Sequence, residues 1–279
     1  MKYTVLSLFP QIIDVFFENS IMSKAVDRGI IRWQSINIRD YAFDKHKSCD
    51  DAPYGGGAGM LMLPGPLSLA LEAVGAKKKP VQDDKNPRCR ATGYFCSLKE
   101  LQSGSNNAQP APEKSTLSNI KTEPPRACTA EKMPPRVIYL SASGRLFNQQ
   151  YARELAREDE LILICGRYEG IDQRIVDLYV DDEISIGDYI LSCGETAALT
   201  VIDATYRLID NVITPESLNE ESFENGLLEY PQWTRPEEFE GLKVPDVLLS
   251  GHHENIKKWR RQQSIEKTKT MRPDLLFEP

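Results

Sequence analysis

Five short apolar runs are spread along the chain, and between them apolar positions recur three and four residues apart. The runs predict buried strands, at residues 3–9, 32–38, 137–140, 161–165 and 182–186. The periodic segments predict helices, at residues 10–27, 66–74, 148–157, 171–179 and 196–209. Because strands and helices alternate, residues 1–213 predict an α/β domain with a parallel sheet flanked by helices.

Two segments interrupt this alternation. Residues 77–135 hold eight prolines and little apolar periodicity, so we interpret them as an insertion that is mostly disordered. Residues 214–229 are acidic and polar, which is typical of an interdomain linker. Residues 230–279 then predict a small helical domain, with a helix at residues 254–264.

The charge of the chain, −7 overall, is distributed unevenly. Residues 137–250 hold 8 Lys and Arg against 23 Asp and Glu, whereas residues 251–279 hold 7 against 4 and residues 77–136 hold 12 against 6. A phosphate backbone would meet the basic segments and avoid the acidic middle. Two alternatives remain open from the residues alone: the basic helix is an ordinary solvated face, and the insertion is either inert or an aid in holding RNA.

Several classes of protein are disfavoured by the composition. Six cysteines form no CxxC pair and only three histidines are present, so neither a zinc site nor a disulfide framework is predicted, and we assign no metal ligand. No apolar run approaches 18 residues and no targeting signal is apparent, so we expect a cytoplasmic protein without a membrane partner. The glycine-rich loop at residues 55–59 lacks the spacing of nucleotide-binding loops.

Two glycine-containing loops directly follow predicted strands. They read GRYEGID at residues 166–172 and SIGDYILS at residues 185–192. In open α/β sheets the carboxyl ends of the strands are where ligands bind, because the loops there expose backbone groups and glycine lets a ligand approach. The pair of loops therefore predicts a binding site.

Other short segments occur in a fixed order with these loops. They are SLFP at 7–10, DDAPYGGGAGM at 50–60, VIYLS at 137–141, SF at 222–223, GLL at 226–228, YP at 230–231, TRP at 234–236 and VPDVLLSGH at 244–252. In this order they resemble the bacterial tRNA (guanine-N1)-methyltransferases of the SPOUT class, over residues 1–76 and 136–276. That resemblance implies a parallel sheet with a deep trefoil knot, a small C-terminal helical domain and an obligate homodimer.

The resemblance also implies that the knot loops bind S-adenosylmethionine. The positions carried over are Tyr139, Leu140, Ser141, Gly166, Tyr168, Glu169, Gly170, Ser185, Ile186, Gly187, Tyr189, Leu191 and Gly194. Three departures from the family pattern fall in these loops: Ala142 and Ala197 stand where relatives have proline, and Cys193 stands where they have glycine.

The implied reaction is methyl transfer to N1 of guanosine 37 of tRNA, beside the anticodon. It needs a base for the N1 proton and a cation for the charge that moves to O6. The base position is matched by Glu221, where the family has aspartate, and the cation position by Arg207, with Asp177 as a candidate support for the arginine. The longer glutamate displaces the carboxylate by one methylene, and a misplacement of about 1 Å can cost about a hundredfold in rate.

Contacts with tRNA are expected from two basic groups. The candidates are Arg39, Lys45, His46 and Gly59 in and before the glycine-rich loop, and Lys257, Lys258, Arg260 and Arg261 in the C-terminal helix. Magnesium is described as assisting the family activity, but no cluster of carboxylates identifies its ligands. Two other hypotheses remain open: an RNA-binding relative that lost turnover through Glu221 and Cys193, and a small-molecule enzyme unrelated to RNA.

Overall fold

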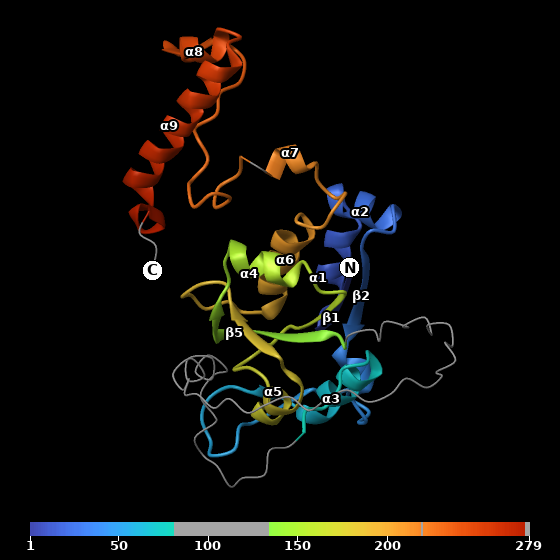
Figure 1. The fold of residues 1–279 in the computed structure, drawn as a ribbon. Helices are drawn as coiled ribbons and strands as arrows, with labels where there is room; N and C mark the ends of the chain where they lie inside the picture. Colours follow the sequence, from blue (N-terminus) through green and yellow to red (C-terminus); the bar gives the residue numbers. More distant parts are fainter. Residues whose placement is uncertain (81–133, 219, 277–279) are drawn as a thin grey trace, which may run out of the picture. The chain divides into compact units, whose positions relative to one another are not determined.

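A single five-stranded sheet forms the centre of the protein (Figure 1). The computed structural model describes residues 1–80, 134–218 and 220–276. The strands are parallel and lie in the order β2-β1-β6-β5-β7. Their bounds are β1 (Lys2–Ser7), β2 (Arg32–Asn37), β5 (Arg136–Leu146), β6 (Glu160–Ile164) and β7 (Asp182–Ser185). The α/β class and all five strand positions predicted from the apolar runs are confirmed.

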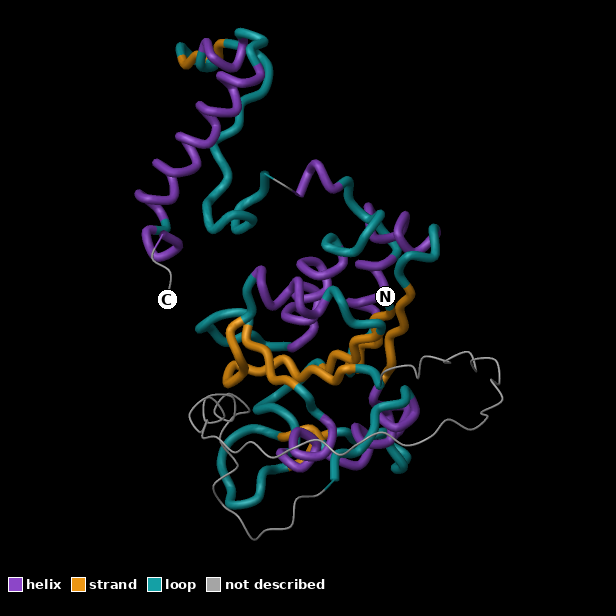
Figure 2. Tube along the Cα trace, in the orientation of Figure 1, coloured by secondary structure: helices purple, strands orange, loops and turns teal. Residues whose placement is uncertain are grey.

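Helices cover both faces of the sheet, as Figure 2 shows. On one face lie α1 (Gln11–Phe17), α2 (Ser20–Asp27), α4 (Gln149–Leu155) and α6 (Gly194–Tyr206). On the other lie α3 (Pro64–Ala73), α5 (Gln173–Tyr179) and the short η1 (Ile38–Tyr41). The side chains of β6 alternate between the two cores: Leu161 and Leu163 pack against the first group of helices, and Ile162 and Ile164 against the second.

The helix predicted over residues 10–27 is wrong in one respect, because it is two helices. Asn19 is extended (φ −123°, ψ 158°) and Ser20 has a positive φ of 64°, so the right-handed helix cannot continue through them. The Asn19 side-chain amide donates to the carbonyl of Val15 at 2.6 Å, which satisfies a carbonyl freed at the end of α1. The apolar periodicity runs through both helices and therefore hides the break.

Strand β5 is longer than its apolar run. It continues to Leu146 through an irregularity in its pairing with β7 between Leu140 and Arg145. Gly144 lies in this bulge, where a Cβ would overlap the backbone of Glu183 and Ile184. The bulge turns the polar segment at residues 141–143 toward the carboxyl edge of the sheet, where the predicted binding loops lie.

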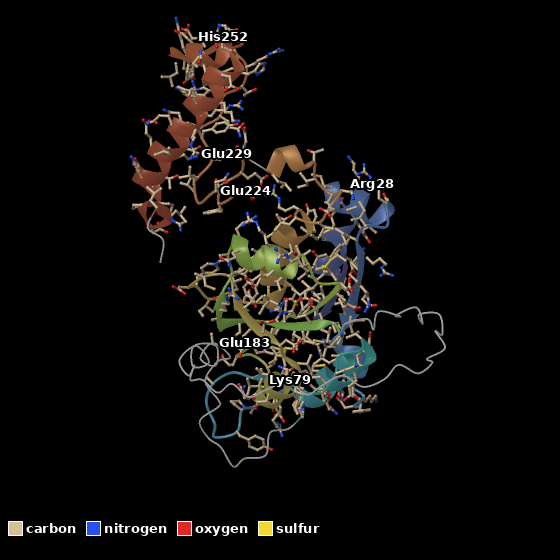
Figure 3. All side chains as sticks on the ribbon, in the orientation of Figure 1. Arg28, Lys79, Glu183, Glu224, Glu229 and His252 are labelled. Atoms are coloured by element: carbon tan, nitrogen blue, oxygen red, sulfur yellow. The ribbon has the colours of Figure 1, made fainter. Side chains whose placement is uncertain are left out.

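After α6 the chain contains the short α7 (Pro215–Leu218), β8 (Glu238–Phe239), β9 (Leu242–Lys243), α8 (Asp246–Leu249), the long α9 (His253–Met271) and η2 (Pro273–Leu276). Helix α9 extends seven residues past the predicted end at residue 264, because Thr268 is buried and its hydroxyl accepts the N–H of Leu228 at 2.9 Å. In Figure 3, Glu224 and Glu229 mark the segment that leads into this part of the chain.

Some expectations concern residues outside this description. The insertion predicted at residues 77–135 falls mainly on residues 81–133, which lie outside the described residues. The domain boundaries at 213 and 229 and the trefoil knot stay predictions. Within the described residues, no helix combines the length and the apolar character that crossing a membrane requires.

Candidate functional site

Three loops at the carboxyl edge of the sheet enclose a cavity of about 380 Å³. One is the bulge within β5, and the other two follow β6 and β7; these three strands are neighbours at one side of the sheet. The lining includes every residue carried over as a cofactor contact, namely Tyr139, Leu140, Ser141, Gly166, Tyr168, Glu169, Gly170, Ser185, Ile186, Gly187, Tyr189, Leu191 and Gly194. Residues spread over 56 positions of the sequence thus come together as one pocket.

Tyr139 explains why two of the loop positions are glycine. A Cβ at Gly166 or Gly170 would lie 3.1 Å from the hydroxyl oxygen of Tyr139, closer than side chains normally pack. Gly170 also has a φ of 126°, which other residues rarely adopt. Burial raises the pKa of the Tyr139 phenol above its ordinary value, so this side chain stays a neutral hydroxyl in the wall of the cavity.

The start of α6 packs against the loop after β6. The N–H of Gly194 donates to the carbonyl of Gly166 at 2.9 Å, and a Cβ at Gly194 would stand 2.7 Å from the Gly166 nitrogen. Glycine is therefore required where the two loops touch. Cys193, the departure from the family pattern, directs its sulfur to the hydroxyl of Thr196 at 3.6 Å while lining the cavity.

A buried polar network behind the cavity was not predicted. Glu195 is fully buried, and its Oε1 accepts from the hydroxyl of Ser7, also fully buried, at 2.5 Å. Its Oε2 lies 3.5 Å from Nε of Arg167, whose guanidinium carbon stands 4.4 Å from the ring centre of Phe9. The network therefore joins the end of β1, the loop after β6 and the start of α6. Arg167 belongs to the GRYEGID motif at residues 166–172, but only the fold could reveal that it lies beside Glu195.

The glycine-rich loop at residues 55–59 and Met60 contact the cavity loop that follows β6. A Cβ at Gly59 would overlap the side chain of Glu169, and the N–H of Glu169 donates to the carbonyl of Met60 at 3.0 Å. The hydroxyl of Tyr168 donates to Asp50 at 3.3 Å, with Tyr168 held at a positive φ of 58°. The loop expected to face RNA is thus directly coupled to the loop expected to hold the cofactor.

The two residues predicted to carry the chemistry form an ion pair. Nη2 of Arg207 donates to Oε1 of Glu221 at 2.6 Å, with both side chains about one-third exposed. Arg207 caps the C-terminal end of α6. The linker that bears Glu221 is also tied to the body by an ion pair between Arg153 of α4 and Glu224.

This ion pair and the cavity lie at opposite ends of one helix. Gly194 begins α6 and Arg207 follows its thirteenth residue. At a rise of 1.5 Å per residue, the two ends are about 20 Å apart. Asp177, the candidate support for the arginine, bonds Gln173 on α5, on the other face of the sheet from α6. Within one chain, therefore, Arg207 and Glu221 do not reach a ligand in the cavity, and Asp177 does not reach Arg207.

The predicted RNA contacts fall into two groups. In the first, Lys45 and His46 are exposed, Arg39 bonds the carbonyl of Lys47 at 3.4 Å, and Gly59 lies against Glu169. In the second, on α9, Lys257, Lys258 and Arg261 are exposed. Arg260 differs from them, since it donates to Glu220 at 3.3 Å and lies over the ring of Tyr230.

A metal site is not evident from the geometry. In the described parts of the chain, no three His, Cys, Asp or Glu side chains are grouped closely enough to hold an ion. Cys49, Cys165 and Cys193 are free thiols.

Comparison with known proteins places the chain in a family. The family described as tRNA (Guanine-1)-methyltransferase TrmD matches residues 1–84 and 116–278. Proteins named tRNA (guanine-N(1)-)-methyltransferase are similar over 99% of this chain: one from Treponema denticola at 51% identity, covering 90% of that protein, and one from Borrelia hermsii at 50% identity, covering 92%. A protein of the same name from Treponema pallidum is 48% identical and covered over 88% of its length. The family resemblance seen in the motifs is confirmed, and the chain belongs to the tRNA (guanine-1)-methyltransferase family.

Proposed function

We propose that this enzyme transfers the methyl group of S-adenosylmethionine to N1 of guanosine 37 in tRNA, with Glu221 as the base and Arg207 as the cation. Family membership over nearly the whole chain supports the reaction. The observation that carries the assignment of residues is the 2.6 Å hydrogen bond between Arg207 and Glu221, which brings together the two kinds of group that the chemistry needs.

The ion pair can act on both N1 and O6 of guanine. A carboxylate has two oxygens and several lone pairs, so Glu221 can accept from Arg207 and also take the N1 proton. A guanidinium has five N–H donors, so Arg207 can hold Glu221 and also donate to O6, where negative charge grows as the proton leaves. Since N1 and O6 are adjacent on guanine, neighbouring base and cation suit this reaction. The target base has to leave its stack to reach them.

The cavity suits the methyl donor. Its volume of about 380 Å³ lies within the range of small-molecule sites, roughly 300–1,000 Å³. Glycines at 166, 170 and 194 line it without side chains, and the neutral Tyr139 adds apolar ring surface. When bound, S-adenosylmethionine supplies a methyl group on a sulfonium; the chain's part is to orient that methyl and to exclude water.

The active site is shared between two copies of the chain. The cavity and the ion pair are about 20 Å apart along α6, so the base of one copy has to serve the cavity of another. A second copy has a candidate surface to bind: Phe9, Ile12 and Val15 on and before α1 are exposed, and Ile190 beside the cavity is 85% exposed. We therefore propose a homodimer, acting in the cytoplasm, that binds tRNA through the basic groups named above. Assistance by magnesium stays a prediction.

The direct test is methyl transfer from labelled S-adenosylmethionine to unmodified tRNA, followed by nuclease mapping of the label. Wild type should place the methyl on N1 of guanosine 37. The Glu221→Ala variant should lose about 100-fold or more in rate, since positioned bases contribute about that much. Glu221→Asp should keep activity, because it retains the carboxylate.

The outcomes separate the alternatives. Retention of tRNA without any methyl transfer by wild type would favour the RNA-binding relative that lost turnover, and recovery of transfer in Glu221→Asp would identify that side chain as the cause. Failure to retain tRNA even at low salt would contradict an RNA substrate.

A further inference from the structure

In the C-terminal segment, residues 230–276, the apolar side chains are exposed or only half-buried. Among the described residues of this segment, the only buried ones are Ser264 and Thr268, and both are polar. Trp233 is 41% exposed and Leu249 is 52% exposed. Aromatic and aliphatic surface gathered in this way and left unused by the segment's own packing is typical of a binding surface.

These side chains line a cavity of about 450 Å³ that is formed entirely by residues of this segment. Figure 3 labels Glu229, just before the first lining residue, and His252, just before α9. Trp233 packs against Trp259 with ring centres 5.4 Å apart, so its orientation is held although much of it is exposed. On another wall, the guanidinium of Arg260 lies 4.7 Å from the ring centre of Tyr230. The lining includes Tyr230, Trp233, Arg235, Leu248, Ile256 and Arg260.

The charge around the cavity favours an anionic ligand. Two arginines, Arg235 and Arg260, line it against one acid, Glu237. Arg235 makes no ion pair with any described acid, and it is exposed. Lys257 and Arg261 of α9 do not line this cavity but a separate one, beside Glu220 and Glu221. An anion reaching the cavity would therefore meet cations on the arginine side.

Planar apolar surface beside guanidinium groups is the chemistry that binds single nucleotides. A base stacks on an aromatic ring through its π-face whatever its identity, while arginine neutralises the phosphate. We propose that this cavity binds one unstacked nucleotide of the tRNA, with the base on Trp233 and its phosphate at Arg235. The nucleotide is not the methylated guanosine, because neither Glu221 nor Arg207 lines the cavity. This inference rests on the proposed tRNA substrate.

The test compares Trp233→Ala and Trp233→Phe with Phe239→Ala. Phe239 is an exposed aromatic of the same segment that does not line the cavity, so it controls for loss of aromatic surface. Filter binding with unmodified tRNA should show a dissociation constant raised about tenfold in Trp233→Ala, since one stacked base contributes that much or more. Trp233→Phe should stay near wild type, and Phe239→Ala should equal it.

Steady-state kinetics provide the second readout. Trp233→Ala should raise KM for tRNA while KM for S-adenosylmethionine and kcat stay unchanged, a split that general unfolding would not produce. Wild-type affinity for tRNA in Trp233→Ala would overturn the proposal. Conversion of a dimer to a monomer by Trp233→Ala, seen by sedimentation, would overturn it in favour of a subunit interface. Absence of methyl transfer by wild type, with tRNA binding still dependent on Trp233, would instead count against the proposed function alone.

Discussion

The α/β body and the C-terminal segment use their apolar residues in different ways. The body buries its apolar side chains in two cores, one on each face of the sheet, and Tyr3, Leu6, Leu67 and Tyr151 are fully buried. The C-terminal segment buries Ser264 and Thr268 and leaves its tryptophans and leucines at least partly exposed. The body can therefore hold its cavity loops in place without a ligand, whereas the segment is built to gain contacts when something binds to it.

The proposed catalytic pair, Arg207 and Glu221, connects these two regions. Arg207 is fixed by the end of α6, and Glu221 comes from the linker that leads to the C-terminal segment. The hydrogen bond between them therefore depends on the position of the linker. Through the linker, tRNA binding by the C-terminal segment can control the reaction in the α/β body.

The largest effect is expected from Arg207→Ala. Removal of a cation that meets developing charge lowers kcat about 100- to 1,000-fold. Because the cavity is about 20 Å away along α6, the dissociation constant for S-adenosylmethionine, measured by calorimetry, should not change. Arg174→Ala is the matched control, since Arg174 is an exposed arginine that pairs with Asp172 on α5. Equal losses of cofactor binding and turnover in Arg207→Ala would contradict the separation of the two sites.

A second change tests whether the cavity loops of the α/β body are rigid. Gly194→Ala places a methyl group 2.7 Å from the backbone nitrogen of Gly166, so α6 or the loop has to move. Overpacking of this kind costs about 1–3 kcal/mol, and S-adenosylmethionine should bind about tenfold more weakly or worse. In Gly65→Ala, also in the first turn of a helix, the new methyl group meets nothing within 4 Å, and both binding and stability should match wild type. Tight cofactor binding by Gly194→Ala would show that the loops adapt freely.

Disruption of the buried polar network behind the cavity should have a smaller effect. Ser7→Ala removes the donor to Oε1 of Glu195 and leaves a buried oxygen short of a partner, which lowers the free energy of unfolding by about 1–3 kcal/mol. Urea denaturation measures this loss. Ser68→Ala, which removes an exposed hydroxyl bonded to the carbonyl of Gly65, should leave stability near that of wild type. Equal stability of the two variants would mean that Glu195 does not need Ser7.

A still smaller effect is expected at Asp172, which caps α5. Its carboxylate accepts the N–H of Arg174 at 2.9 Å, and the Arg174 side chain holds the pKa of Asp172 below its ordinary value. A lowered folded-state pKa means that this stabilisation is present above the unfolded pKa, about 3.9, and is lost as pH falls below it. At neutral pH, Asp172→Ala should cost about 0.5–1 kcal/mol. The gap between variant and wild type, followed by thermal unfolding, should narrow as the pH falls from the unfolded-state pKa through the lowered folded-state pKa of Asp172.

Asp274 provides the matching ion pair in the C-terminal segment. Its pKa is lowered in the same way by Arg272, but both side chains are exposed near the end of the C-terminal segment. Asp274→Ala should leave the unfolding of the body unchanged at every pH. A pH-dependent loss of stability in this variant would mean that the segment and the body unfold as one unit.

The sequence predicted the parts of the fold that depend on local pattern. Continuous apolar runs identify the buried strands of a parallel sheet, and the glycine motifs after them identify the loops of the cavity. The break at Asn19 was hidden because apolar residues continue at helical spacing on both sides of it. The extension of β5 was hidden because its second half pairs through a bulge made of polar residues and Gly144.

Long-range polar contacts could not be predicted. Ser7 and Glu195 are 188 positions apart, and nothing local indicates that a glutamate in the first turn of a helix is fully buried. The 20 Å between the cavity and Arg207 is also a consequence of the fold, although the length of α6 was nearly right in the prediction. Motifs name the residues of a site, but only the arrangement of elements shows how far apart those residues lie within one chain.

The most direct test of a shared active site is complementation between two defective subunits. Leu191→Arg adds a cation to a cavity that has to hold a sulfonium, and Glu221→Ala removes the base; each parent should be inactive. After the two are mixed, dissociated and reassociated, half of the dimers are mixed and each carries one intact site, so about one quarter of wild-type methyl transfer should return. If cavity and base act within one chain, mixing would restore nothing, and the account of a shared site would be wrong.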